Sequence, residues 1–350
     1  PISSQESYDN SGLIVGDNSA EVRNVLISLD CIEATVDEAI RLGCELIIAH
    51  HPIVFKGLKK INGSNYIERT VIKAIKNDVA IYAIHTNFDN YRYGVNDEIA
   101  ERIGLTNRRI LAPKNDVLTK VAFFVPSVNS ADVLGAMFDA GAGEIGEYAE
   151  CSFQSMGIGT FKPKDGASPF EGQVGVLSTL EESKVEVICS LHNLTRVIAA
   201  MHATHPYEEV AYEVYSMKNM NQFEGAGMIG ELTIEVDELE FLTKLKSQFK
   251  CGVIRHTALL GKKIQKVAVC GGSGSFLLEQ AKRNGADIFI TGDFKYHEFF
   301  DAEDEIIIAD IGHFESEQYT SHRIERILTK KFTKFAVHLT EENTNPIKYF

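Results

Sequence analysis

The stretch LIIAHHPIVF, residues 46–55, places two adjacent histidines where an apolar run stops at a proline. A short, continuous run of aliphatic residues is typical of a strand that is buried on both faces of a parallel sheet. Neighbouring side chains on a strand point to opposite faces, so His50 and His51 cannot easily hold one object together. We therefore expect the two histidines to serve different partners at the end of this strand.

The sequence on either side of this stretch alternates between apolar strands and helices. In the N-terminal part, strands are predicted over 22–31, 45–51 and 79–85, with helices over 35–43, 66–76 and 95–103. The C-terminal part repeats the pattern, with strands over 264–270, 286–291, 305–310 and 334–339 and helices over 276–284 and 315–330. Apolar strands joined by helices indicate mostly parallel sheets that are covered on both faces. The predicted fold class is α/β, built as two lobes.

The middle of the chain has a different order of predicted strands and helices. Strands are predicted over 120–125, 184–189 and 210–215, helices over 130–141 and 191–202, and a glycine-rich, strand-rich stretch over 150–175. This order predicts a small α+β module of ferredoxin-like type, inserted into a loop of the main domain. The predicted divisions are an N-terminal lobe over 1–116, the inserted module over 117–225 and a C-terminal lobe over 226–350.

Composition narrows the classes of partner. The net charge of −14 repels a phosphate backbone, so we expect no general nucleic-acid binding. No apolar run approaches the length of a membrane span, and the six cysteines form no CxxC pair. Scattered, reduced thiols are typical of a cytoplasmic protein. The chain begins at Pro1 rather than at methionine, so a preceding helix or leader is left open.

Polar residues gather where the predicted strands end. Five of the eleven histidines follow such strands, and three acidic residues and a tyrosine accompany them. The carboxyl ends of the strands in an open α/β sheet are where ligands bind. If the two lobes pack together, these loops converge on one cleft. The residues concerned are His50, His51, His85, Asp89, Asp293, Tyr296, His297, His313 and Glu317.

The chemistry of this set indicates a metal centre. Imidazoles and carboxylates without thiolates suit Zn, Fe, Mn, Co or Ni ions, and they argue against a closed structural zinc site. His313 and Glu317 are four residues apart, which places them on one face of a helix. Two divalent metal ions bridged by a carboxylate such as Glu317 would give His50 and His51 one ion each.

Each residue by itself also has a simpler interpretation. One of the paired histidines can be a core residue that is bonded to a carbonyl, and Asp89 can cap a helix or a turn. Glu317 suits the first turn of a helix, Asp293 suits a turn, and His297 suits an exposed helix face. We interpret CGGSGS (270–275) as a tight strand–helix turn and HPYEE (205–209) as structural.

Six motifs resemble, in order, the signatures of the Nif-three-like family, whose members are often labelled GTP cyclohydrolase 1 type 2 homologues or dinuclear metal centre proteins. They are ESYDNSGLIVGD (6–17), AHHPIVFKGLKKI (49–61), IHTNFDN (84–90), CGGSG (270–274), TGDFKYHE (291–298) and DIGHFESE (310–317). The resemblance implies a two-lobed fold with a two-metal cleft, a PII/CutA-like insertion and a homohexamer. It also assigns His50, His51, Asp89, His313 and Glu317 to the metals, with His85, Tyr296 and His297 lining the cleft.

Three functions remain open from the sequence. The first is a metal-dependent hydrolase of a nucleotide or other phosphorylated small molecule, with ring-opening of GTP as one version. His85 or His297 would then carry protons, and Asp293 and Tyr296 would contact the substrate. The second is a non-catalytic protein that stores, delivers or senses metal. The third is a scaffold whose metals hold subunits together.

Overall fold

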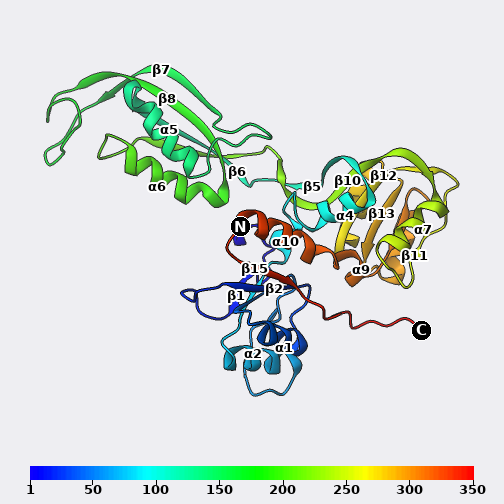
Figure 1. The fold of residues 1–350 in the computed structure, drawn as a ribbon. Helices are drawn as coiled ribbons and strands as arrows, with labels where there is room; N and C mark the ends of the chain where they lie inside the picture. The colour runs from blue at the N-terminus through cyan, green and yellow to red at the C-terminus, as the bar shows by residue number, and fades with distance from the viewer. The chain divides into compact units, whose positions relative to one another are not determined.

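The computed structural model describes residues 1–350, and the chain divides into two compact units (Figure 1). The main unit combines Pro1–Pro113 with Phe223–Phe350, and the insert is Lys114–Gln222. The main unit therefore forms from the two ends of the chain. No helix has both the length and the apolar character that a membrane crossing requires.

The first sheet of the main unit holds five strands in the order β1-β4-β3-β2-β15. Their bounds are Gly12–Val15 (β1), Asn24–Ser28 (β2), Leu46–Ala49 (β3), Ala80–Ala83 (β4) and Ala336–Leu339 (β15). Four of them run parallel, and only the edge strand β1 is antiparallel to its neighbour β4. The last strand of the chain thus lies beside β2. Helices α1 (Glu33–Leu42) and α2 (Tyr66–Lys76) cover one face, where Val36 and Val71 join the core.

The second sheet holds six strands in the order β11-β14-β13-β12-β10-β5. Their bounds are Thr106–Lys114 (β5), Asn221–Asp237 (β10), Arg255–His256 (β11), Lys263–Ser273 (β12), Ile288–Gly292 (β13) and Ile307–Asp310 (β14). Strands β12, β13 and β14 are parallel, whereas β10 and β11 are antiparallel to their neighbours β12 and β14. The expectation of mostly parallel sheets therefore holds for the first sheet and for the centre of the second.

Several elements were not anticipated from the sequence. Strand β10 is interrupted by Gly225, Gly227 and Gly230, and β5 carries Pro113 and two arginines, so neither reads as a buried strand. The continuous helix expected over 315–330 is instead two helices, α9 (His313–Glu317) and α10 (Thr320–Lys331). Strands β1 and β11 and helices α3 (Thr86–Asp89) and α7 (Glu238–Gln248) complete the additions.

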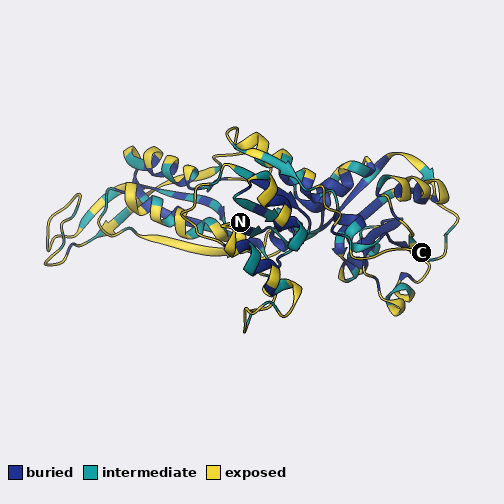
Figure 2. Ribbon diagram, turned by 60° about the horizontal axis from the view of Figure 1, so that its bottom comes forward, coloured by how far each residue is buried: buried dark blue, intermediate teal, exposed yellow.

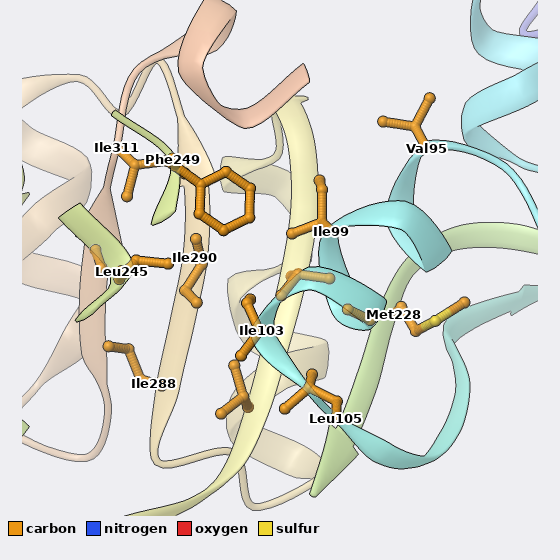
Figure 3. Close-up of a cluster of buried hydrophobic side chains, with 14 of the residues drawn as sticks. Val95, Ile99, Ile103, Leu105, Met228, Leu245, Phe249, Ile288, Ile290 and Ile311 are labelled. Atoms are coloured by element: carbon orange, nitrogen blue, oxygen red, sulfur yellow. The ribbon is translucent and has the colours of Figure 1, made fainter. Parts of the chain in front are cut away.

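A shared hydrophobic core joins the two sheets of the main unit. Val25 and Ile27 from β2 belong to the same buried cluster as Ile288 and Ile290 from β13. Helices α4 (Val95–Ile103), α7 and α10 contribute to this cluster as well. Figure 3 shows Ile99 and Ile103 of α4 directed towards the strands, with Leu245 of α7 and Phe249 in the same cluster. On the outer face of the second sheet, α8 (Leu278–Arg283) packs with Phe289.

The insert is a four-stranded antiparallel sheet with two helices. Its elements are β6 (Leu118–Pro126), α5 (Ser130–Asp139), β7 (Ser152–Phe161), β8 (Ser178–Ser190), α6 (Leu194–Thr204) and β9 (Tyr212–Met217). The spatial order β7-β8-β6-β9 with this chain order is the ferredoxin-like arrangement. Both helices pack on one face through Val133, Met137, Val197 and Met201, and the buried residues of the sheet lie on β6 and β8, whereas β7 and β9 are largely exposed (Figure 2).

Candidate metal centre

In the first sheet, the carboxyl ends of three parallel strands carry the histidines of the site and an aspartate that supports one of them. Asp30 follows β2, His50 and His51 follow β3, and His85 follows β4. Because these strands are parallel, their carboxyl ends lie at the same edge of the sheet. His50 is fully buried there, whereas His51 and His85 are partly buried. The short helix α3 begins directly after His85, and Asp89 is its last residue.

The second sheet supplies the remaining residues from the equivalent edge. Asp293 follows β13, and His313 begins α9 just after β14. Glu317 ends the same short helix, one turn after His313, and it is 3% exposed. The spacing of four residues therefore directs both side chains to one face, as the sequence predicts.

Glu317 lies at the centre of the cluster, and its two carboxylate oxygens face different groups. Its Oε2 lies 3.0 Å from His51 Nε2 and 3.1 Å from His313 Nε2. Its Oε1 lies 3.7 Å from His50 Nε2, which in turn is 3.5 Å from Asp89 Oδ1. Two potential ligand groups result, His51–His313–Glu317 and His50–Asp89–Glu317, and in each the donor atoms lie within 4.8 Å of one another. They share one carboxylate.

Two buried polar atoms in this cluster lack a hydrogen-bond partner. His50 Nε2 and Asp89 Oδ1 are both enclosed, and neither makes a hydrogen bond. An unsatisfied buried donor or acceptor costs about 1–3 kcal/mol, so native proteins rarely leave such atoms alone. A cation between the imidazole nitrogen and the carboxylate oxygen satisfies both at once. The donors present therefore fit a divalent metal ion.

Each histidine is held from its far side. His50 Nδ1 donates to the Ile84 carbonyl at 2.8 Å, His51 Nδ1 faces Asp30 Oδ1 at 2.7 Å, and His313 Nδ1 faces Asp293 Oδ2 at 2.7 Å. A metal-binding histidine typically donates its second ring nitrogen in this way, which fixes the ring and leaves the other nitrogen for the ion. In all three residues the nitrogen that faces the cluster is Nε2.

His85 has the same kind of support but a different environment. Its Nδ1 lies 2.7 Å from Asp9 Oδ1, and the other oxygen of Asp9 accepts a hydrogen bond from the Thr86 backbone N–H. The ring lies 5.4 Å from that of His50 and 5.5 Å from that of His51, between centroids. One ring nitrogen of His85 lies close to one ring nitrogen of His50 and one of His51. These three histidines therefore form a further group that could hold a metal ion.

A glycine of the CGGSG motif, at the carboxyl end of β12, allows this strand to approach Glu317. Gly272 has a left-handed φ of +61°, and a Cβ at this position would lie 2.5 Å from Glu317 Oε1. Its backbone N–H donates to Ser316 Oγ at 2.9 Å, in the helix that carries the two ligands. The carboxyl end of β12, just before η4 (Ser275–Leu277), therefore packs against the cluster and needs glycine at this position.

The electrostatics reflect several ionisable groups in a confined space. Burial disfavours protonation of His51, but its hydrogen bonds with Asp30 and Glu317 outweigh burial and raise its pKa to about 10. For His313, burial is outweighed by the charge of Glu317 and the bond with Asp293, which raise the pKa to about 11. Burial alone would raise the pKa of Glu317, but His313 and the other imidazoles hold it well below its usual value.

Asp89 and His85 are shifted in the other direction. Burial raises the pKa of the Asp89 carboxyl, against the opposing effect of His50. Burial, reinforced by His50, lowers the pKa of His85 despite its bond with Asp9. A cluster in which two imidazoles favour the charged form while one carboxyl and one imidazole favour the neutral form is typical of a functional site.

The structure brings five of the predicted residues into contact and places the others nearby or at the surface. His50, His51, Asp89, His313 and Glu317 form the two ligand groups. Asp293 contacts His313. Tyr296 and His297 begin η5 (Tyr296–Ala302), and both are exposed; their rings contact each other at 5.1 Å between centroids.

Sequence reasoning missed the two supporting aspartates of the first sheet, Asp30 and Asp9. Asp30 carried a usable signal, because it stands at the end of the strand predicted over 22–31, at the same edge as His50. Asp9 carried a weaker signal, since it precedes β1 and belongs to a loop. Its contact with His85 spans 76 residues of sequence and depends on the tertiary structure.

Comparison with known proteins gives a consistent result. The family model described as Duf34/NIF3 (NGG1p interacting factor 3) matches residues 1–346. Proteins named GTP cyclohydrolase 1 type 2 homolog are 40% identical over 346 residues in Halalkalibacterium halodurans and 39% identical over 347 residues in Bacillus subtilis, each match covering 97% of this chain and 93% of the relative. A crystal structure of a Bacillus cereus protein related to NIF3 is 40% identical, with a TM-score of 0.86, covering 100% of this chain and 95% of the other. The chain belongs to the Duf34/NIF3 family.

Proposed function

We propose that this protein binds two divalent metal ions at the candidate metal centre and hydrolyses a nucleotide or another phosphorylated small molecule with their help. The observation that carries the proposal is the division of the Glu317 carboxylate, with one oxygen towards His51 and His313 and the other towards His50. One shared carboxylate between two donor groups is the arrangement that a two-metal site uses. The mixed nitrogen and oxygen donors favour Zn, Fe, Mn, Co or Ni.

Bound metal ions would also supply the positive charge that a phosphorylated substrate requires. The protein has a net charge of −14, so a phosphorylated substrate needs a local source of positive charge. When bound, a pair of divalent ions neutralises phosphate charge and lowers the pKa of a coordinated water molecule. The relatives' name, GTP cyclohydrolase 1 type 2 homolog, supports GTP as the first nucleotide to test.

The residues of this chain would position the substrate and move protons. His85 favours its neutral form because burial lowers its pKa, and Asp9 holds its Nδ1 proton. Its other nitrogen is then free to accept a proton, which is the role of a general base. His297 is the second candidate for proton transfer, and Asp293 and Tyr296 are the candidates for substrate contact. Tyr296 is 73% exposed and free to meet a ligand.

Metal content is the first measurement. Protein purified without added ions should contain up to two divalent ions per chain by elemental analysis, and His51→Ala should remove at least one of them. The control is His202→Ala, since His202 lies on the exposed side of α6 in the insert and should leave the metal content unchanged. Equal metal content in all three proteins would contradict the proposed ligands.

Activity is the second measurement. Metal-loaded protein should turn over at least one member of a panel of nucleotides and phosphoesters, and His51→Ala should abolish that turnover. His85→Gln should keep both ions and lower kcat by about 10²–10⁴-fold, as the loss of a general base does. Loss of an ion in His85→Gln would make His85 a ligand instead. Turnover that is insensitive to His51→Ala would exclude metal-dependent hydrolysis here.

A non-catalytic, metal-handling function is the alternative. The side chain of His313 is 35% exposed and that of Asp293 is 50% exposed, so one side of the cluster is open to solvent. An open side permits ions to be exchanged with an acceptor. Rapid transfer of bound metal to a competing chelator, without turnover of any substrate, would favour this function over hydrolysis.

We also propose that the insert is a PII/CutA-like module and that the chain assembles as a homohexamer. The ferredoxin-like strand order of the insert supports the first proposal. Light scattering coupled to size exclusion tests the second, with a mass of six times 38.8 kDa expected. The same measurement after chelation tests whether metal ions hold the subunits together, since a scaffold function requires the assembly to dissociate.

A further inference from the structure

The insert contains a cavity that the metal chemistry does not use. It has a volume of about 460 Å³ and lies between the ends of β7 and β8, the loop around Phe170 and the turn before β9. Cavities of about 300–1,000 Å³ are the usual size for small-molecule sites. All of its lining residues belong to Lys114–Gln222, so the cavity is a property of the insert alone.

The walls of this cavity are aromatic. Phe124 of β6, Phe161 of β7, Phe170 and Tyr207 all line it. The rings of Phe170 and Tyr207 contact each other, with centroids 6.1 Å apart and a tilt of 49°. Phe170 is 53% exposed, so part of its ring is available to a ligand. Aromatic faces carry partial negative charge and attract cations.

A buried carboxylate completes the wall. Glu182 of β8 is 9% exposed, and its Oε1 accepts a hydrogen bond of 2.8 Å from the Tyr207 hydroxyl. Its Oε2 accepts no hydrogen bond, and no lysine, arginine or histidine lies within ion-pair distance of the side chain. The second oxygen of Glu182 is therefore available to a cationic group that enters the cavity.

The backbone around Glu182 is built to accommodate it. A Cβ at Gly159 would lie 1.8 Å from Glu182 Oε2, so the glycine of β7 provides the room that this oxygen occupies. His205 fixes the turn that presents Tyr207, because its Nε2 donates to the Phe124 carbonyl at 3.0 Å and its Nδ1 accepts from the Tyr207 N–H at 3.1 Å. With these bonds the His205 ring is neutral, and it offers Glu182 no compensating charge.

The remaining charges at the cavity are mostly negative. Glu171, Glu208 and Glu209 line it together with Glu182, whereas Lys162 is the single basic residue among the lining side chains. Glu208 is already engaged with the Ser168 N–H at 2.9 Å. Four carboxylates against one ammonium exclude a phosphate or carboxylate ligand and favour a cation.

We propose that this cavity binds a small organic ammonium ion, with its charge against Glu182 and its apolar body against the rings of Phe124, Phe161, Phe170 and Tyr207. Aromatic faces and a carboxylate are the groups that recognise such ions, and a bare metal ion would not use the apolar walls. The site is separate in its residues from the candidate metal centre. It gives the insert a ligand-binding function of its own.

Three probes, each a phenyl ring on a short chain with a different end group, separate the contribution of charge to binding from that of apolar contact. They are 2-phenylethylammonium, the uncharged 2-phenylethanol and the anionic 3-phenylpropanoate, titrated into the full chain and followed by calorimetry and ligand-observed NMR. The ammonium is expected to bind saturably and at least tenfold more tightly than the alcohol, and the anion is expected not to bind. Equal affinities for the ammonium and the alcohol would overturn the proposal, as would the absence of saturable ammonium binding.

Two variants locate the binding. Glu182→Gln keeps the size of the side chain and an acceptor for Tyr207 but removes the charge, so it should weaken ammonium binding at least tenfold and leave the alcohol unchanged. The control is Glu186→Gln, on the same strand and paired with Lys120 outside the cavity, which should bind both probes like the wild type. An unaltered circular dichroism spectrum shows that each variant is folded.

Oligomerisation supplies the competing explanation. A second copy of the chain could fill the cavity, and ammonium binding would then be absent while Glu182→Gln changed the mass measured by light scattering. That outcome overturns the proposal. Unchanged mass together with loss of ammonium binding in Glu182→Gln supports it.

Discussion

Three carboxylates and one carbonyl set the orientation of the imidazoles in the candidate metal centre. Asp30, Asp293 and Asp9 contact the Nδ1 atoms of His51, His313 and His85, and the Ile84 carbonyl accepts from His50. None of these partners faces the centre of the cluster itself. Each directs an Nε2 atom inwards and favours its basic form, so their influence on metal binding is indirect.

Asp30→Asn should weaken metal binding about 10–100-fold without removing a ligand, because the groups that hydrogen-bond to metal-binding histidines contribute that much to affinity. Thr344 Oγ also donates to Asp30, at 2.6 Å, so the aspartate is held from two sides. Affinity is measured by competition with a chelator of known strength. Asp37→Asn is the control. Asp37 lies on the surface of α1, where it pairs with Lys73, so this variant should bind metal with full affinity. Equal affinity in both variants would remove Asp30 from the site.

Metal affinity should rise with pH from about pH 6 to about pH 9. In the metal-free protein the pKa of His51 is raised to about 10 and that of His313 to about 11, so both imidazoles are protonated near neutrality. A metal ion needs their neutral form and must displace these protons. Calorimetry in buffers of different ionisation enthalpy should therefore detect proton release on binding. Affinity that is constant over this range would mean that neither histidine is a ligand.

At the scale of elements, the glycine-containing carboxyl end of β12 decides how closely this strand approaches Glu317. Gly272 lies in the left-handed region and against Glu317, while α9 begins one residue after another left-handed glycine, Gly312. Gly312 allows α9 to begin close to the end of β14, where it presents His313 and Glu317.

Gly272→Ala should lower the free energy of unfolding by about 1–2 kcal/mol or more, since a left-handed alanine costs that amount before any clash with Glu317 is counted. It should also weaken metal binding, because the added methyl group displaces the carboxylate. Denaturant titration and chelator competition measure the two effects. Gly57→Ala is the control, since a Cβ there meets nothing within 4 Å, and its effect should stay within about 0.5 kcal/mol.

At the scale of the whole molecule, the two ends of the chain fold together into one unit. Strand β15 at the end of the chain pairs with β2, and β5 from the N-terminal part joins the second sheet, so both sheets contain strands from both ends. The insert leaves and re-enters the main unit between β5 and β10. Such interleaving makes the main unit one cooperative core, although its sequence is divided by about a hundred residues.

Cysteine reactivity should report on that packing. Five of the six free cysteines are buried, and only Cys151 is partly exposed. Burial raises the pKa of Cys31 and Cys251 to about 12, which suppresses the reactive thiolate. Folded protein should therefore take up about one equivalent of iodoacetamide rapidly near pH 8 and the rest only on unfolding. Mass spectrometry identifies the labelled residue, and rapid labelling of Cys31 in folded protein would contradict the structure.

The sequence by itself determined the local elements and the edge at which the ligands lie. Apolar runs and glycine stops are local signals, so the strands around His50 and His85 and the helices between them were predictable. The position of the candidate ligands at the carboxyl ends of parallel strands followed from the same pattern. The interrupted strands β5 and β10 were not predictable, because glycines and a proline break the apolar pattern by which a buried strand is recognised. Their place in the sheet depends on pairing with neighbouring strands.

Only the tertiary structure decided which atoms meet. Glu317 and His51 are separated by 266 residues, and no local rule specifies that one carboxylate oxygen should lie between two imidazoles from different sheets. The same holds for Asp9 behind His85 and for Glu182 in the cavity of the insert. Periodicity specifies the face on which a side chain lies, whereas distances of about 3 Å between groups on separate elements arise from the packing of the whole core.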